Sequence, residues 1–112
     1  MLRSQVLKYL LDVESAITEL EKIVDLSGHS YSDFSSNFLA VRAAERDLMI
    51  IGEAMNKLRN VDSNIKITGT RDIIGLRNLL VHSYDSIDPT LIWKIMMKDI
   101  PILKKEIEEL RM

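Results

Sequence analysis

The sequence predicts an all-α fold, an up-down bundle of four main helices in which the third helix is short. Two observations support this fold class. Apolar residues recur at spacings of three and four along most of the chain, and no segment shows the apolar-polar alternation of a half-buried strand. The 112 residues are 46% hydrophobic and 29% charged, which suits one folded core. We therefore expect residues 1–112 to form a single helical domain.

The first helix is predicted over residues 2–26. Its apolar stripe consists of Val6, Leu10, Val13, Ile17, Leu20 and Val24. Ser27 and Gly28 are typical of a helix end, and residues 30–33 offer polar groups that can cap the next helix. His29 lies in this short connection, and we expect it to be solvated rather than a ligand.

The second helix is predicted from Phe34 to Arg59, followed by a turn-rich loop over residues 60–70. The apolar positions expected on its buried face are Phe38, Val41, Leu48, Ile51, Met55 and Leu58. Met49, Met55, Met96 and Met97 also occupy apolar helical positions along the chain and are expected to fill gaps in the core.

The third helix is predicted to begin near Thr70 and to fray after Val81. The fourth should begin at Asp88-Pro89, because an N-cap aspartate precedes a proline at the first helical position. Its apolar stripe comprises Trp93, Met96, Ile100, Leu103, Ile107 and Leu110. Pro101 removes one backbone hydrogen bond and should kink this helix.

Composition excludes several classes of function. The formal charge of −2 provides no global positive field for nucleic acid, so any phosphate site must be local and no DNA binding is expected. The chain has no cysteine and only two histidines, neither in a Glu-x-x-His pair, so we expect no metal site and no cofactor. No apolar stretch is long enough to span a membrane, and the absence of cysteine is compatible with a cytoplasmic location.

A cluster of polar residues lies within the apolar third helix. Arg77, Asn78, His82 and Tyr84 fall within eight consecutive positions. Arg77 and Tyr84 are seven residues apart and nearly eclipsed on a helix, whereas Arg77 and His82 are about 140° apart. Both could reach one site only if the helix loosens near His82 or the cleft is broad. The alternative is that Arg77 and Tyr84 lie on a solvated face while His82 caps the last carbonyls.

The run from Arg77 to Tyr84 resembles the Arg-x4-His-x-Tyr signature of HEPN-domain proteins of the HepT toxin type, the partners of minimal nucleotidyltransferase antitoxins. Residues 50–54, 71–76, 87–93 and 99–101 resemble further segments of the same family. The resemblance implies the toxin of a type VII-like toxin-antitoxin pair. It also implies a metal-independent endoribonuclease that is neutralised by AMPylation of Tyr84.

The chemistry of metal-free RNA cleavage gives each residue of the motif a role. Arg77 suits the phosphorane charge, because guanidinium stays protonated and donates two parallel hydrogen bonds. His82 suits proton transfer, and Asn78 can bind the substrate or orient the imidazole. One imidazole cannot act as acid and base in the same step, so we expect a homodimer with a composite active site at its interface. Arg71 and Arg46 are possible sources of additional positive charge.

Met49 stands where relatives of this family often carry an acidic residue. Glu53 is the remaining candidate for a carboxylate that supports the site, and the alternative is an ion pair with Arg46 or Lys57 on its own helix.

Two other functions are compatible with these residues. The chain could be a non-catalytic helical partner subunit of a nucleotidyltransferase that binds nucleotide or protein through the Arg-His-Tyr set, or a plain oligomerisation bundle. Tyr84 could equally pack its ring across the dimer interface instead of accepting AMP.

Overall fold

The computed structural model describes residues 4–62, 65, 75 and 88–111. Within these ranges the elements are α1 (Ser4–Leu26), α2 (Tyr31–Ser36), α3 (Phe38–Val61), α5 (Pro89–Lys94), the π-helical turn η1 (Ile95–Asp99) and α6 (Ile100–Leu110). No strand occurs among these residues, which confirms the all-α fold class. The predicted third helix lies outside the described residues, apart from Gly75.

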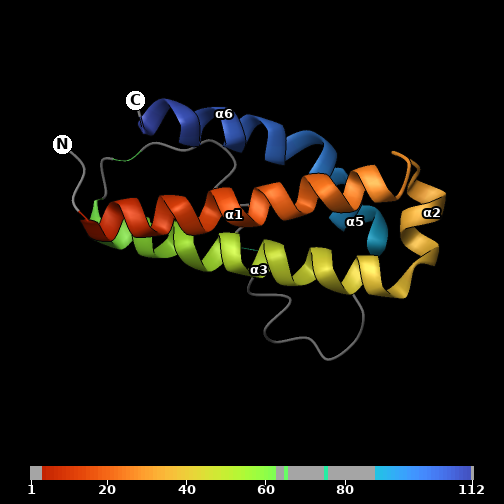
Figure 1. Cartoon of the computed structure of the whole chain (residues 1–112). Helices are drawn as coiled ribbons and strands as arrows, with labels where there is room; N and C mark the ends of the chain where they lie inside the picture. The colour runs from red at the N-terminus through yellow and green to blue at the C-terminus, as the bar shows by residue number, and fades with distance from the viewer. Residues whose placement is uncertain (1–3, 63–64, 66–74, 76–87, 112) are drawn as a thin grey trace.

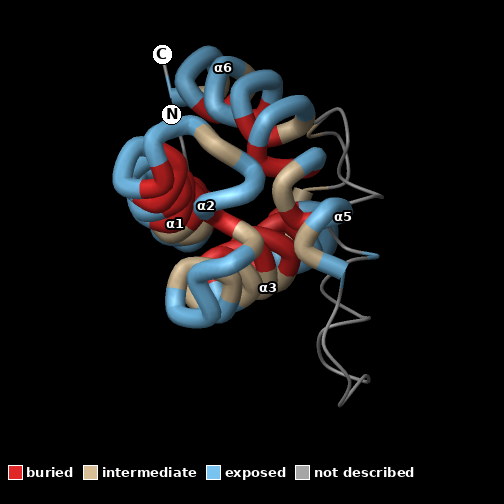
Figure 2. Tube along the Cα trace, turned by 90° about the vertical axis from the view of Figure 1, so that its right-hand side faces the viewer, coloured by how far each residue is buried: buried red, intermediate tan, exposed pale blue. Residues whose placement is uncertain are grey.

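The three long helical segments run along a common axis. Figure 1 shows α3 antiparallel to α1, and α6 running back beside α1 in the same direction as α3. Viewed along this axis, α1, α3 and α6 surround the buried side chains, with α5 completing the enclosure near α3 (Figure 2). Among the described helices, none is long and apolar enough to cross a membrane.

Helix α1 agrees with its sequence prediction. All six residues of the predicted apolar stripe are buried, together with Ala16 and Ile23. The helix ends with two residues in the left-handed region, Gly28 at φ 64° and His29 at φ 56°. The His29 N–H donates to the Val24 carbonyl at 3.0 Å, which satisfies one of the last carbonyls of the helix.

The predicted second helix is wrong at its beginning, because the structure divides it at Asn37. Ser30 caps α2 by accepting from the Asp33 N–H, as its sequence position indicated. Asn37 then adopts an extended conformation, and its side-chain oxygen accepts from the N–H groups of Leu39 and Ala40. Asparagine is a preferred N-cap residue, so a new helix begins at Phe38.

This division contradicts the burial predicted for Phe38 and places Phe34 in the core instead. Phe34 in α2 is fully buried, and the centroid of its ring lies 5.2 Å from the centroid of the Trp93 ring. Phe38, which was predicted to be in the core, is 66% exposed, and the Arg42 guanidinium lies 5.2 Å from its ring centroid. The break at Asn37 shifts the register, so the 34–38 spacing no longer places both rings on one face. The remaining predicted residues of α3 are buried or pack against the core.

The C-terminal helix begins as predicted, with the Asp88 side chain accepting from the Thr90 N–H and Pro89 in the first turn. Its register changes at η1, where the Ile100 N–H donates to the Ile95 carbonyl, five residues earlier. This wider turn lies immediately before Pro101, which has no N–H to continue the α-helical pattern. Ile92 of α5 and Ile95 of η1 are also buried, beside the predicted Met96, Ile100, Leu103 and Ile107.

Candidate functional site

The residues of the predicted active site divide into two groups. Arg71, Arg77, Asn78, His82 and Tyr84 lie outside the described residues, so their catalytic and modification roles stay predictions. Arg46 and Glu53 lie on α3, and it is their surroundings that the structure describes.

Arg46 and Glu53 are seven residues apart, which places them two turns from each other along one side of α3. Arg46 is exposed, whereas Glu53 is half-buried. Lys57, one of the two partners considered for Glu53, has its ammonium 5.7 Å from the centroid of the Tyr9 ring on α1. The supporting role of Glu53 therefore stays a prediction.

Asp47 is a chemically unusual residue of α3 that the sequence analysis did not identify. It is only 3% exposed, and its Oδ2 atom is buried without a hydrogen-bond partner in the protein. The pKa of Asp47 is raised to about 7, mainly because the carboxyl is buried and also because the Glu19 carboxyl on α1 lies beside it, while the Arg46 charge acts in the opposite direction. The Asp47 carboxyl is therefore suited to bind a proton near neutral pH.

A signal for Asp47 was present in the sequence. Ala44, Leu48 and Ile51 form the buried stripe of α3, and Asp47 stands three residues after the first and four before the last. An acidic residue at this position of an apolar stripe must lose its hydration when the helix packs. Such a group is a candidate for a functional or pH-sensitive role, although ion-pair networks in purely structural positions perturb pKa values too.

His29 is exposed, as expected, and its Nε2 lies 3.0 Å from Asp25 Oδ1, one turn earlier in the chain. Among the described residues, no group of three or more histidine, aspartate or glutamate side chains is arranged to hold a metal ion.

Comparison with known proteins identifies a family. The model described as "Ribonuclease HepT-like" matches residues 13–110. A "Putative RNase" of Methanocaldococcus jannaschii is 38% identical over 111 residues, covering 96% of this chain and 98% of that protein. A "Probable ribonuclease HepT" of Thermococcus cleftensis is 32% identical over 107 residues, covering 92% and 93% of the two chains. No solved structure matches the chain.

Proposed function

Because the chain belongs to the HepT-like ribonuclease family, we propose that it is an endoribonuclease that cleaves RNA without a metal ion. The observation that carries the proposal is the family match over residues 13–110, because this range includes the whole run from Arg77 to Tyr84. In this mechanism the RNA 2′-hydroxyl attacks the adjacent phosphorus and the 5′-oxygen leaves. His82 transfers protons, Arg77 stabilises the phosphorane charge and Asn78 orients the reacting groups.

The active site of this proposal is shared by two protomers. A two-fold axis close to residues 77–84 would supply two imidazoles, one to remove a proton and one to deliver it. Static light scattering should therefore give a homodimer at micromolar concentration. A monomer that retains full RNase activity would reject the composite site.

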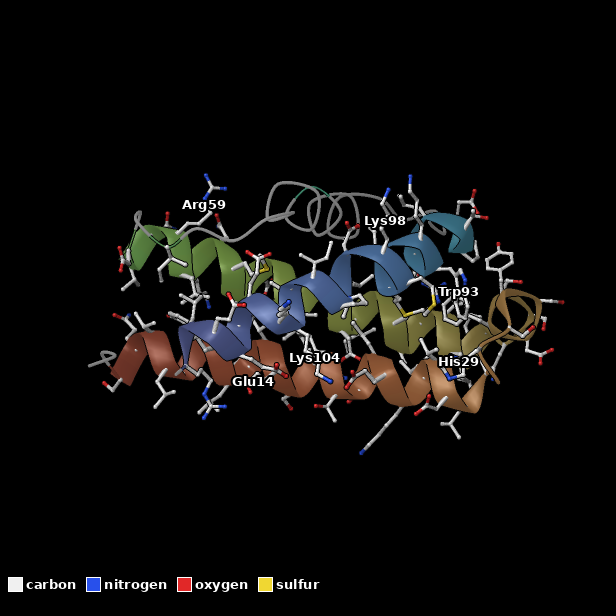
Figure 3. The ribbon with its side chains drawn as sticks, turned by 90° about the horizontal axis from the view of Figure 1, so that it is seen from above. Glu14, His29, Arg59, Trp93, Lys98 and Lys104 are labelled. Carbon is white, nitrogen blue, oxygen red and sulfur yellow. The ribbon has the colours of Figure 1, made fainter. Side chains whose placement is uncertain are left out.

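Two of the described basic residues lie where they could contact RNA away from α1. Arg59 and Lys98 are exposed and extend away from α1 (Figure 3). Helix α1 itself carries exposed residues of both signs, Glu19, Glu21 and Asp25 together with Lys8 and Lys22. Basic side chains on one side can contact phosphates locally even though the formal charge of the chain is −2.

Cleavage assays on the full chain test the catalytic roles. Arg77→Ala and His82→Ala should each lower the cleavage rate by about a hundredfold or more, because each removes transition-state stabilisation. Cleavage by the wild type should persist in EDTA and leave a 2′,3′-cyclic phosphate. Lys8→Ala, which removes a cation from an exposed pair with Asp12 on α1, is the matched control and should retain activity. Full activity in either motif variant would favour the non-catalytic partner subunit, and a strict requirement for added Mg²⁺ would reject the mechanism.

We further propose that the chain is the toxin of a type VII-like toxin-antitoxin pair, and that a minimal nucleotidyltransferase transfers AMP to the Tyr84 hydroxyl. The added phosphate would compete with RNA for the cationic site. With a cognate nucleotidyltransferase and ATP, intact-mass analysis should detect AMP on the wild type and none on Tyr84→Phe. The modified wild type should lose RNase activity, while Tyr84→Phe escapes neutralisation. An adduct that persists in Tyr84→Phe would contradict this assignment.

A further inference from the structure

A hollow lies between α1 and the C-terminal helix, whereas Asp47 and Glu19 meet between α1 and α3. It is a cavity of about 590 Å³, open to solvent on one side. Its apolar wall is contributed from both helices by Leu20, Val24, Met96, Met97, Ile100 and Pro101. A smaller hollow of about 50 Å³ continues along the same seam beside Glu14 and Glu108. We call the two hollows together the α1–α6 groove.

The groove exists because the C-terminal helix is irregular at this point. Met96 and Met97 belong to the π turn η1, and Pro101 lies in the first turn of α6. The π turn carries one more residue than an α turn, so neighbouring side chains leave the regular apolar stripe. Met97, predicted to fill the core, is instead 40% exposed at the groove. Methionine is flexible and polarisable, and such side chains adapt to the shape of a bound apolar group.

The wall residues recur at helical spacing. On α1, Leu20 and Val24 are four residues apart, and on the opposite wall Met96 and Ile100 are also four apart. Between these residues the groove follows about one turn of each helix, a length of roughly 6 Å at 1.5 Å per residue. It can receive apolar side chains that are themselves spaced four residues apart on a helix.

The rim of the groove carries more negative than positive charge. Four carboxylates line the two hollows, those of Glu14, Glu21, Asp25 and Glu108, against one ammonium group, that of Lys104. Arg111 also neutralises part of this charge, because its Nη1 donates to both carboxylate oxygens of Glu14 at 2.6 and 2.8 Å. The remaining excess of negative charge favours a cationic occupant and disfavours RNA.

Lys104 of α6 reaches across the seam toward α1, and it lines both hollows. Its Nζ donates to Glu21 Oε2 at 2.7 Å, and this hydrogen bond raises the pKa of Lys104. Figure 3 shows Lys104 reaching from α6 toward α1, between Glu14 and His29. A cation from outside could replace Lys104 at Glu21, because both groups of this ion pair are about half exposed.

We propose that the α1–α6 groove docks a basic amphipathic helix of a partner protein. Two apolar side chains of that helix, four residues apart, would enter the groove along Met97 and Pro101. Lysine or arginine side chains flanking them would pair with Glu21 and Asp25. None of the residues that line the groove belongs to the Arg77–Tyr84 motif.

A defined peptide tests the proposal on the full chain. The probe is a fluorescent helical peptide of about 14 residues with leucines four apart and flanking lysines, and its binding is followed by fluorescence anisotropy. Glu21→Gln combined with Asp25→Asn should weaken binding by about tenfold. The matched control, Glu109→Gln with Asp33→Asn, also removes two exposed carboxylates but none from the groove, and it should bind like the wild type. In methyl-labelled protein, the resonances of Met96 and Met97 should shift on binding while that of the buried Met55 stays unchanged.

Four results would overturn the proposal. The first is equal weakening in the groove variant and the control variant, which would indicate general attraction to an acidic surface. The second is equal binding of a scrambled peptide of the same composition, or of a peptide with glutamate in place of lysine. The third is displacement of the peptide by an RNA oligonucleotide. The fourth is loss of self-association in the Glu21→Gln, Asp25→Asn variant, which would assign the groove to a second copy of the chain. Since none of these measurements involves RNA cleavage, failure here leaves the proposed RNase function unaffected.

Discussion

Helix α1 has two long neighbours, and it packs against them in different ways. Its interface with α3 buries Asp47, whose pKa rises to about 7 through this burial and the neighbouring Glu19 carboxyl. Its seam with α6 is bridged at the surface by Lys104 with Glu21 and by Arg111 with Glu14, and it leaves a cavity of about 590 Å³. We therefore expect substitutions at the α1–α3 interface to change stability more than substitutions at the α1–α6 seam.

The largest difference in the free energy of unfolding is expected between substitutions of a core residue of α3 and of an exposed residue at the α1–α6 seam. Leu48→Ala should lower the free energy of unfolding by about 2–5 kcal/mol, because Leu48 is fully buried and its truncation leaves a cavity. Met97→Ala should cost less than about 1 kcal/mol, because Met97 already lies against the groove. Urea unfolding followed by circular dichroism measures both values. Equal losses would remove the distinction between the two interfaces.

The next effect concerns the pH dependence that Asp47 introduces at the α1–α3 interface. Its pKa rises from 3.8 to about 7 on folding, so the folded state binds the proton more tightly. The stability contributed by this proton is complete below pH 3.8 and is lost as the pH rises through about 7. Asp47→Asn should therefore have a higher free energy of unfolding than the wild type at about pH 8, by on the order of 1–3 kcal/mol, and should unfold at a higher urea concentration.

Two comparisons check the origin of this effect. The advantage of Asp47→Asn should shrink as the pH is lowered toward 4, because the wild-type carboxyl then becomes protonated. Glu19→Gln should reduce the pH dependence in part, since the Glu19 carboxyl is one of the causes that raise the pKa of Asp47 and burial is another. A wild-type stability that does not fall between about pH 4 and pH 8 would contradict the buried-carboxyl explanation.

The smallest effect is expected at the α1–α6 seam. Arg111→Ala removes both hydrogen bonds to Glu14, yet the pair is partly exposed and solvent screens it. The loss in unfolding free energy should be about 0.2–1 kcal/mol and should decrease further in high salt. Thermal unfolding at low and high ionic strength measures this difference. A loss comparable with that of Leu48→Ala would show that the seam, too, is essential for folding.

Local patterns were sufficient to predict several elements. Three predictions that depend on residues within one or two turns of each other are confirmed: the six-residue stripe of α1, a capping side chain among residues 30–33, and the Asp88-Pro89 start of the C-terminal helix. Family membership was likewise predicted from a short polar run and is confirmed by the comparisons. The roles of Arg77, Asn78, His82 and Tyr84 stay predictions that depend on that membership and on the chemistry of the side chains.

Other features depended on competition between nearby signals. Phe34 and Phe38 have the right spacing for one helix face, but the Asn37 side chain caps a new helix and separates them. Pro101 indicated a missing hydrogen bond, yet the sequence could not specify that the helix would respond with a π turn over residues 95–99. In each case several local conformations satisfy the backbone, and packing against the rest of the bundle selects one of them.

The helical class, the helix start at Asp88 and the family could be predicted from the sequence, because helical periodicity, capping and a motif each lie within a short stretch of chain. The contact of Asp47 with Glu19 and the bridge from Lys104 to Glu21 could not, because they join residues 28 and 83 positions apart and require the helices to be packed. Both the perturbed carboxyl and the α1–α6 groove arise where two helices meet. Their burial and charge depend on distances between helices, which no periodicity along a single helix encodes.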